Sequence, residues 1–436
     1  CRGGGAHGIG DAMTALYIVE LVIGLGFAIL LHEFGHFVAA RLVKIRVLKF
    51  SIGFPPKLFG VKVGHTEYVV QATPLGGYVK LSGEEWEETG RLKPYDLMAK
   101  PWYARIGVYV AGVTMNLILA WAIFLAVYAH GIELGTHPPV AGEVSRKGAA
   151  WAAGFRPGDR LVSVNGVAVA NWYDIYNELD RAGAGKTATV KIVRDRAPMT
   201  LPLPVAAELG FQPRVDAVVG GVVPMDRAAK AGFKAGDRVL AIGERPIRGW
   251  AEMSLVLANA PEKAVKVRVR RGAKTIELVV TPRRDAIQKR SFIGISSAAP
   301  LTVTKRFTAV ECVKMASLEA GLIAWEIPKS IWRVVAGQQR LKDVLGGPVM
   351  IVRLGMAKAE QGIWDFLHFL GVLNVSLLVV NLLPIPAVDG GMIVLAFLEG
   401  IRRRRFSMAV YARLQQVGVV LLLALVAFTL FNDLAR

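Results

Sequence analysis

The sequence predicts a multi-pass membrane protein. We expect a bundle of four transmembrane α-helices, a membrane-proximal β-hairpin region and two small extracytoplasmic α+β domains. Three observations lead to this prediction. Hydrophobic residues make up 53% of the 436 residues, and the mean hydropathy of +0.42 is too high for an ordinary soluble protein. Four apolar runs are long enough to cross a bilayer, and the polar middle of the chain contains an internal repeat.

The chain is strongly basic, with 53 Lys and Arg against 34 Asp and Glu and a formal net charge of +19. Such an excess is also found in nucleic-acid-binding proteins. Here, however, the basic residues gather beside apolar runs, as at Arg41, Lys44 and Arg46 and in Arg402–Arg405. Positive charge next to a span marks its cytoplasmic end and attracts anionic headgroups. We therefore expect membrane lipids as partners and no nucleic acid.

The first span, 14–43, carries the motif His32-Glu33-x-x-His36 in its second half. On a helix the two imidazoles lie one turn apart on one face, where both are able to bind one Zn²⁺, and Glu33 is placed to take a proton from water. The alternative is a surface helix with two chance histidines. Ionisable groups in a span cost about 2.5–3.5 kcal/mol each, which favours a functional site. Such a site still needs a third protein ligand.

The region 44–103 contains short β-prone runs separated by turn residues. We predict a cytoplasmic β-hairpin and loop region here, because the charge bias places the end of the first span on the cytoplasmic side. Two interpretations remain open for the hairpin. An extended substrate segment adds to it as a strand, or it takes no part in the chemistry.

The second span is predicted at 104–130 and contains Asn116. An asparagine in a span needs a hydrogen-bond partner within the bundle. For Asn116 we favour a role in helix packing over a direct role in a site.

The stretch Ala153–Leu161 (A-G-F-R-P-G-D-R-L) recurs as Ala231–Val239 (A-G-F-K-A-G-D-R-V). Each copy follows a valine-rich run and leads into an apolar strand, which predicts two tandem domains at 136–206 and 214–284. The pattern resembles PDZ domains of the kind associated with bacterial proteases, although Ala235 replaces the usual proline in the second copy. PDZ domains bind peptide ends or strands. Whether this pair binds a peptide or only excludes bulky substrates stays open.

Amphipathic linker helices are predicted at 302–345, either on the outer membrane surface or against the bundle. The third span, 364–391, ends in the pattern N-x-x-P-x-P-x-x-D-G-G, which would break a spanning helix. Broken helices occur in membranes only where protein or a cavity satisfies the freed backbone. The fourth span is predicted at 409–431. The charges beside the spans put both repeats on the outer face.

Asp389 lies in that broken segment, at a depth comparable to that of His32 and His36. A carboxylate there is costly unless it binds a metal or pairs with a cation. We therefore predict Asp389 as the third ligand of a Zn²⁺ site with water in the fourth position. The alternative is a helix cap at the membrane interface. Asn381 is placed to hold an extended substrate backbone or to act as an oxyanion donor.

Four features occur in a characteristic order: the H-E-x-x-H motif, Pro74–Val79 (P-L-G-G-Y-V), the tandem repeats and Asn381–Gly391. In this order they resemble the site-2 protease family of intramembrane metalloproteases, in its bacterial RseP type, over nearly the whole chain. The resemblance implies a zinc endopeptidase. Its substrate would be a single-pass membrane protein, such as a transmembrane anti-sigma factor already cut once outside.

The resemblance also implies roles and a location. His32, His36 and Asp389 would be ligands, Glu33 the catalytic base and Asn381 a substrate contact. The protein would lie in the bacterial inner membrane, with its site toward the cytoplasm and its PDZ-like domains in the periplasm. Val113 stands where the family often has proline, so the role of Asn116 is left open. Two other classes compete with a protease: a non-enzymatic membrane scaffold with peptide-binding modules, and a transporter with a cation site at the midplane.

Overall fold

The computed structural model describes residues 5–84, 92–205, 210–284, 290–339, 341 and 346–435. Residues 85–91, 206, 340 and 342–345, which belong to three of the predicted ranges, lie outside this part. The chain divides into two compact units. One comprises Cys1–His130 and Arg306–Arg436 and is called the membrane unit below. The other comprises Gly131–Lys305 and is called the repeat unit.

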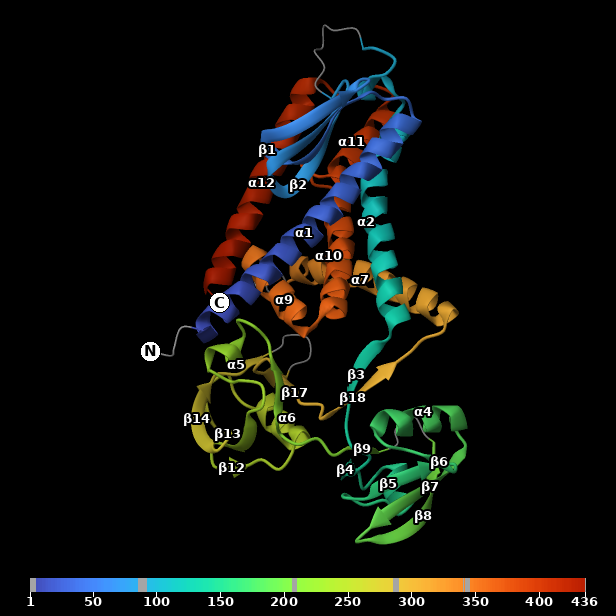
Figure 1. Cartoon of the computed structure of the whole chain (residues 1–436), viewed down its shortest axis with the longest axis vertical. Coiled ribbons are helices and arrows are strands. Elements are labelled where there is room, and N and C mark those ends of the chain that lie inside the picture. Colours follow the sequence, from blue (N-terminus) through green and yellow to red (C-terminus); the bar gives the residue numbers. More distant parts are fainter. Residues whose placement is uncertain are drawn as a thin grey trace. The chain divides into compact units, whose positions relative to one another are not determined.

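The membrane unit is mainly helical (Figure 1). Its elements are α1 (Gly5–Leu42), β1 (Val47–Val63), β2 (Thr66–Leu81), the short 3₁₀-helix η1 (Leu97–Ala99), α2 (Trp102–His130), α7 (Ala309–Val335), α9 (Pro348–Gln361), α10 (Ile363–Leu382), α11 (Asp389–Arg402) and α12 (Met408–Ala435). Within the described residues, four helices are long and apolar enough to cross a membrane, as predicted: α1, α2, α10 and α12.

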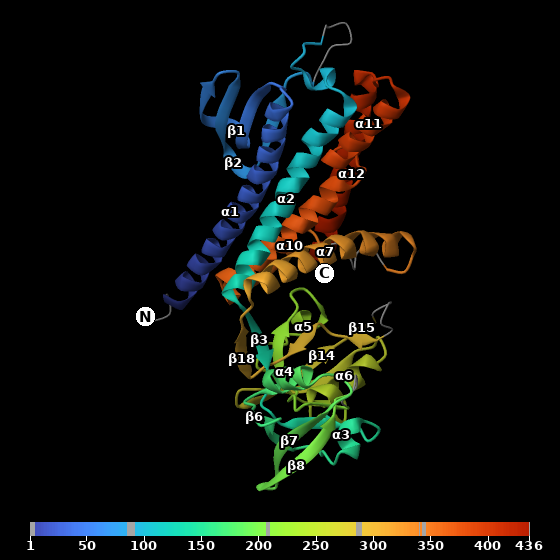
Figure 2. The ribbon, with the colours of Figure 1, turned by 90° about the vertical axis from the view of Figure 1, so that its right-hand side faces the viewer.

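Helices α1 and α2 run side by side in Figure 2 and meet toward their upper ends in Figure 1. Their backbones approach closely because Gly35 of α1 faces the carbonyl of Ala111 on α2, where any side chain would overlap that carbonyl. Small residues at such contacts are typical of membrane helix packing, since the apolar solvent gives no hydrophobic drive to associate. The contact brings the motif face of α1 against the middle of α2.

The predicted third span is divided in the structure. Helix α10 ends at Leu382, and α11 begins at Asp389 after a short irregular segment. Pro384 and Pro386 in that segment have no amide hydrogen to donate to a helix. Gly390 packs directly on the Leu383 carbonyl, where a side chain would not fit. The break therefore folds back on itself and delivers Asp389 at the start of a new helix.

Strands β1 and β2 form a larger sheet than a simple hairpin. Phe50 pairs with both Tyr68 and Val79, so the segment around Phe50 lies between two parts of β2. The outer part of β1 pairs in turn with Thr66–Gln71, as in the pair Val63↔Thr66. The segment Gly77–Leu81 is thus the last strand on one side of the sheet. The sheet lies beside the upper part of α1 in Figure 2.

The repeat unit is rich in β-structure. Its elements are β3 (Ile132–Thr136), β4 (Ala141–Val144), α3 (Ala149–Ala152), β5 (Arg160–Val164), β6 (Val167–Ala168), α4 (Trp172–Ala182), β7 (Thr187–Arg194), β8 (Ala197–Pro204), β9 (Phe211–Pro213), β10 (Val219–Val222), α5 (Arg227–Lys230), β11 (Arg238–Ile242), β12 (Arg245–Pro246), α6 (Trp250–Ala258), β13 (Val265–Arg271), β14 (Lys274–Val280), β15 (Arg283–Arg284), β16 (Ser291–Phe292), β17 (Ile295–Ser297) and β18 (Leu301–Lys305). Its first and last strands, β3 and β18, pair antiparallel.

Two modules of matching topology fill this unit. The first module runs from β4 to β9 and has a sheet of order β6-β5-β7-β8, and the second runs from β10 to β17 with the order β12-β11-β13-β14. In each, the strand that opens the module pairs with the strand that closes it, β4 with β9 and β10 with β17. The closing strands lie past the predicted ends at 206 and 284. Their short length gave no strand pattern to the sequence.

The repeated motif builds the same corner in both modules. Its phenylalanine, Phe155 or Phe233, enters the core of its module. The following aspartate is fully buried, and its carboxylate accepts two hydrogen bonds from an arginine at the end of the central strand: Asp159 from Arg194, and Asp237 from Arg271. The recurring A-G-F-x-x-G-D pattern is thus explained by a buried ion pair that fixes a loop.

Candidate metal centre

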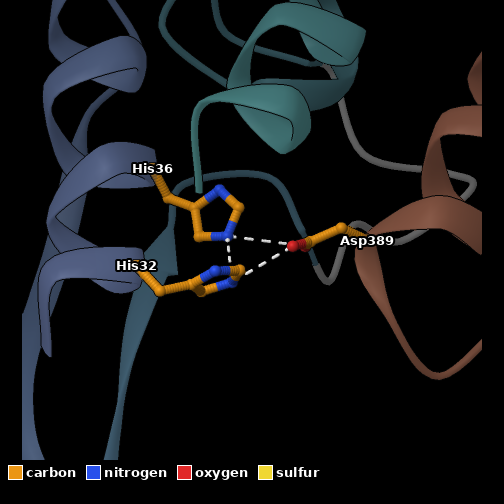
Figure 3. A group of neighbouring side chains, drawn as sticks. All are labelled: His32, His36 and Asp389. Carbon is orange, nitrogen blue, oxygen red and sulfur yellow. Dashed lines mark hydrogen bonds and ion pairs between the residues drawn. The ribbon is translucent and has the colours of Figure 1, made fainter. Parts of the chain in front are cut away.

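Helix α1 presents His32 and His36 one turn apart, and both rings point to Asp389 at the start of α11 (Figure 3). The Nε2 atom of His32 lies 3.1 Å from Asp389 Oδ2, and the Nε2 atom of His36 lies 3.4 Å from Asp389 Oδ1. The two Nε2 atoms are 3.1 Å apart. The structure thus brings together three residues that are remote in sequence and that were predicted as one ligand set.

The donor set fits a metal ion. One ligand atom from each residue lies within 4.8 Å of the others, and both histidines are buried. Asp389 Oδ2 is buried without a hydrogen bond, although His32 Nε2 is close. Two imidazole nitrogens and a carboxylate therefore face one shared point, an arrangement that a bound cation would complete. Two histidines and one carboxylate, with a position left for water, are a common catalytic Zn²⁺ donor set.

Helix α2 supports the two imidazoles from behind. The Nδ1 atom of His36 lies 2.8 Å from the Val108 carbonyl, and the Nδ1 atom of His32 lies 3.3 Å from the amide nitrogen of Asn116. Between these partners is Gly112, where a side chain would overlap the His36 ring. The helix-packing role that the sequence favoured for Asn116 does not account for its contact with the His32 ring. Val108, Gly112 and Asn116 follow one another at intervals of four residues on one face of α2. This spacing was the sequence signal that could have indicated their common role.

A cavity of about 380 Å³ opens at this cluster. Glu33 and Asn381, the two other predicted site residues, both line it, together with Tyr78 and Val79 of β2. The Glu33 carboxylate accepts a hydrogen bond of 3.1 Å from the Val79 amide. The cavity therefore combines the ligand cluster, a carboxylate beside it and the edge of a β-sheet.

The far end of α11 is anchored by a buried acid, Glu399, which is 3% exposed. It forms an ion pair with Arg105 of α2 and accepts hydrogen bonds from the Tyr411 hydroxyl (3.1 Å) and the Phe406 amide (2.7 Å). These contacts tie α11 to α2 and α12. Because Asp389 is the first residue of α11, the same network restrains the helix that carries the third predicted ligand. The sequence did not single out Arg105 or Glu399.

Comparison with known families gives a match over residues 20–425 to the model described as peptidase family M50. The chain belongs to peptidase family M50. Three relatives of this M50 peptidase align over 96% of its length. A Neisseria meningitidis protein provisionally named a zinc metalloprotease is 30% identical over 99% of its own length. The Regulator of sigma-E protease RseP of Escherichia coli K12 is 29% identical over 98%, and a Pasteurella multocida protein with the same provisional name is 31% identical over 98%.

The family match confirms the resemblance to intramembrane metalloproteases that was inferred from the motifs. This M50 peptidase is an enzyme of that class. The family match does not support the competing scaffold and transporter interpretations. Among solved structures, a PDZ domain of an SdrC-like protein from Listeria monocytogenes aligns with 18% of the chain and 84% of its own length at 20% identity. Its TM-score of 0.17 is too low to establish a fold for the repeat modules.

Proposed function

We propose that this M50 peptidase is a zinc endopeptidase that cuts single-pass membrane proteins within the membrane, with Zn²⁺ held by His32, His36 and Asp389. The observation that carries the proposal is the convergence of these three side chains at a cavity that also contains Glu33. Bound Zn²⁺ supplies Lewis acidity to a peptide carbonyl and to an attacking water.

Glu33 is proposed as the general base. Its carboxylate lies in the cavity and is oriented by the Val79 amide at 3.1 Å, so it is available to a water beside the ligand cluster. It takes a proton as the water attacks the carbonyl carbon, and it returns that proton to the leaving amine. The peptide C–N bond breaks, and the products are a new carboxylate and a new amine.

The substrate is proposed to bind as an extended strand along Tyr78–Leu81 of β2. This segment is the last strand on its side of the sheet and lines the cavity. A helical substrate would keep its carbonyls in internal hydrogen bonds, so it must unwind before cleavage. Asn381, from the end of α10, would contact the substrate backbone on the opposite wall.

The orientation in the membrane is proposed from charge. Basic residues follow the motif end of α1 and the C-terminal end of α11, which supports a cytoplasmic location for that end of the bundle in a bacterial inner membrane. The repeat modules, proposed as PDZ-like, would then lie outside and screen substrates by size or by peptide ends. Trp325 and Trp332, each 67% exposed on α7, suit a helix lying at the outer lipid interface.

The name of the Escherichia coli relative links that protein to sigma-E regulation. We infer a related substrate class for this chain: a single-pass membrane protein, such as an anti-sigma factor, that has lost its outer domain to a first cut. The size of the cavity, about 380 Å³, suits one extended segment and not a folded domain.

The test is Glu33→Gln in the full-length protein, assayed on a model transmembrane substrate with bound zinc measured alongside. Cleavage should fall about 10²- to 10⁴-fold, the usual contribution of a general base, while zinc stays bound. Glu20→Gln is the matched control, because Glu20 lies on the same helix and does not line the cavity. Cleavage by Glu33→Gln at the rate of the control would overturn the proposal.

A further inference from the structure

Asn116 has an unusual environment for an asparagine in a transmembrane helix. It is 1% exposed, and its amide nitrogen lies 3.3 Å from Nδ1 of His32. Its Oδ1 atom is buried and has no hydrogen-bond partner among the described residues. A buried, unpaired carbonyl oxygen costs about 1–3 kcal/mol. The amide therefore contacts a proposed ligand ring while leaving its acceptor unused.

The direction of the His32 ring decides how this amide must be oriented. Its Nε2 atom faces Asp389 at 3.1 Å, so a metal would be bound through Nε2. A neutral imidazole that binds a metal through Nε2 carries its proton on Nδ1. An Nδ1–H group facing the Asn116 NH₂ group would set donor against donor. Turning the amide over, which exchanges two atoms of nearly equal size, sets Oδ1 against Nδ1–H.

We propose that Asn116 is a positioning residue for His32: in the metal-bound enzyme its Oδ1 accepts a hydrogen bond from Nδ1–H and holds the ring with Nε2 toward the ion. The proposal rests on the zinc site proposed above. Turning the amide gives Oδ1 a donor and fixes the tautomer of His32, and it moves the NH₂ group to the position that Oδ1 occupies in the structure.

The second histidine shows the same arrangement with a different acceptor. His36 Nδ1 lies 2.8 Å from the Val108 carbonyl, which accepts in every state because it is backbone. Helix α2 thus offers one acceptor to each ring, eight residues apart, with Gly112 between them leaving room for the imidazoles. Only the acceptor for His32 is a side chain. Substitution of Asn116 therefore removes the acceptor for His32 and leaves the acceptor for His36 intact.

The first experiment measures zinc affinity of the full-length protein in detergent by competition with a chelator, a readout that needs no proteolysis. Asn116→Leu keeps the size of the side chain and removes the acceptor, whereas Asn116→Asp keeps an acceptor. Loss of such an outer hydrogen bond lowers metal affinity about 10- to 100-fold. We expect a loss in this range for Asn116→Leu and an affinity near that of the wild type for Asn116→Asp.

Asn374→Leu is the matched control. Asn374 is also 1% exposed in a spanning helix, its amide nitrogen bonds the Leu370 carbonyl at 2.8 Å, and its Oδ1 likewise lacks a partner among the described residues. It does not touch the ligand cluster. If Asn116→Leu and Asn374→Leu bind zinc equally well, or if Asn116→Asp loses as much affinity as Asn116→Leu, the proposal is overturned.

A spectroscopic measurement covers the case in which Asn116→Leu fails to fold. The chain has seven histidines, so ¹⁵N-histidine labelling of the zinc-loaded protein gives few signals. We expect a slowly exchanging, hydrogen-bonded Nδ1–H for His32 in the wild type and in Asn116→Asp. A rapidly exchanging Nδ1–H in the wild type would overturn the proposal. A wild type that binds no zinc would instead refute the proposed metal site itself.

Discussion

Two aspartates, the buried Asp237 in the repeat unit and the partly buried Asp389 in the membrane unit, have very different surroundings. Asp237 in the repeat unit is 0% exposed and has a full set of donors: Nε and Nη2 of Arg271 at 2.7 and 2.8 Å, and the Lys234 amide at 2.9 Å. Asp389 in the membrane unit faces the Nε2 atoms of His32 and His36, each of which has a lone pair when the neutral ring carries its proton on Nδ1.

The difference separates an acid with a structural role from the one that we propose as a metal ligand. Burial alone would raise the pKa of Asp237, but the hydrogen bonds from Arg271 and the Lys234 amide lower it below its ordinary value. That site is complete and needs nothing further. Asp389 has no cationic arginine or lysine partner among the described residues, and one of its oxygens has no hydrogen bond. A carboxylate left incomplete in this way indicates a position for an ion.

Asp389→Asn is the most severe test of whether Asp389, unlike Asp237, binds zinc. Asparagine keeps the shape and removes the anionic ligand, so zinc affinity should fall by more than the about 100-fold expected for loss of an outer hydrogen bond. Cleavage of a model transmembrane substrate should fall to background. Both are measured on the full-length protein, by chelator competition and by gel assay of the cut.

Asp237→Asn serves as the control for this prediction, since it removes a buried carboxylate of the same type from the other unit. It should leave zinc affinity unchanged. If Asp389→Asn binds zinc as tightly as Asp237→Asn does, Asp389 is not a ligand and the distinction between the two acids fails.

The proposed ligand cluster could be predicted from sequence because its signals are local or energetically large. The spacing of His32 and His36 on a helix puts both on one face whatever the helix packs against. Asp389 stood out because a carboxylate at membrane depth is costly without a partner. Neither argument needs a tertiary structure, and the structure brings all three residues together.

The supports of the cluster depend on tertiary geometry and could not be predicted in the same way. Asn116 meets His32 only because α2 is rotated to present Asn116 and Gly112 to α1. Arg105 and Glu399 are almost 300 residues apart, and nothing local in either sequence pairs them. The sheet likewise has Phe50 paired on both sides, a register that short β-prone runs do not specify.

Glu399→Gln allows two acids of the same helix to be compared. Glu399 is buried and has a complete set of partners, whereas Asp389, also on α11, does not. The change leaves the Arg105 guanidinium, 3% exposed, without a counter-charge. Breaking a buried pair in this way costs about 3–5 kcal/mol. We expect a large fall in the temperature of unfolding in detergent. Zinc affinity should change by less than about tenfold, which is less than the loss expected for a residue that supports a metal ligand directly.

The double variant Arg105→Met with Glu399→Leu is the control, since an apolar pair of similar volume often restores stability. A stable Glu399→Gln protein that no longer binds zinc would place Glu399 in the metal site and contradict the assignment of its role as an anchor.

The smallest effect is expected in the repeat unit. Asp237→Asn removes one charge of a pair in which Arg271 is 31% exposed, so the loss is reduced by solvent to about 1–3 kcal/mol. Hydrogen exchange of amides in 131–305 measures this loss within the full-length protein. Asp216→Asn is the matched control: it is 44% exposed and pairs with Arg238, and it should cost about 1 kcal/mol or less.

The pH dependence of the same variant tests the cause of that loss. Because the pKa of Asp237 is lowered in the folded protein, its charge stabilises the fold above the unfolded value of about 3.9, and that stabilisation disappears as the pH falls through the folded pKa. The difference in stability between wild type and Asp237→Asn should therefore be constant above about pH 5 and shrink below about pH 4. A difference that persists unchanged at low pH would show that Asp237 acts through packing and not through its charge.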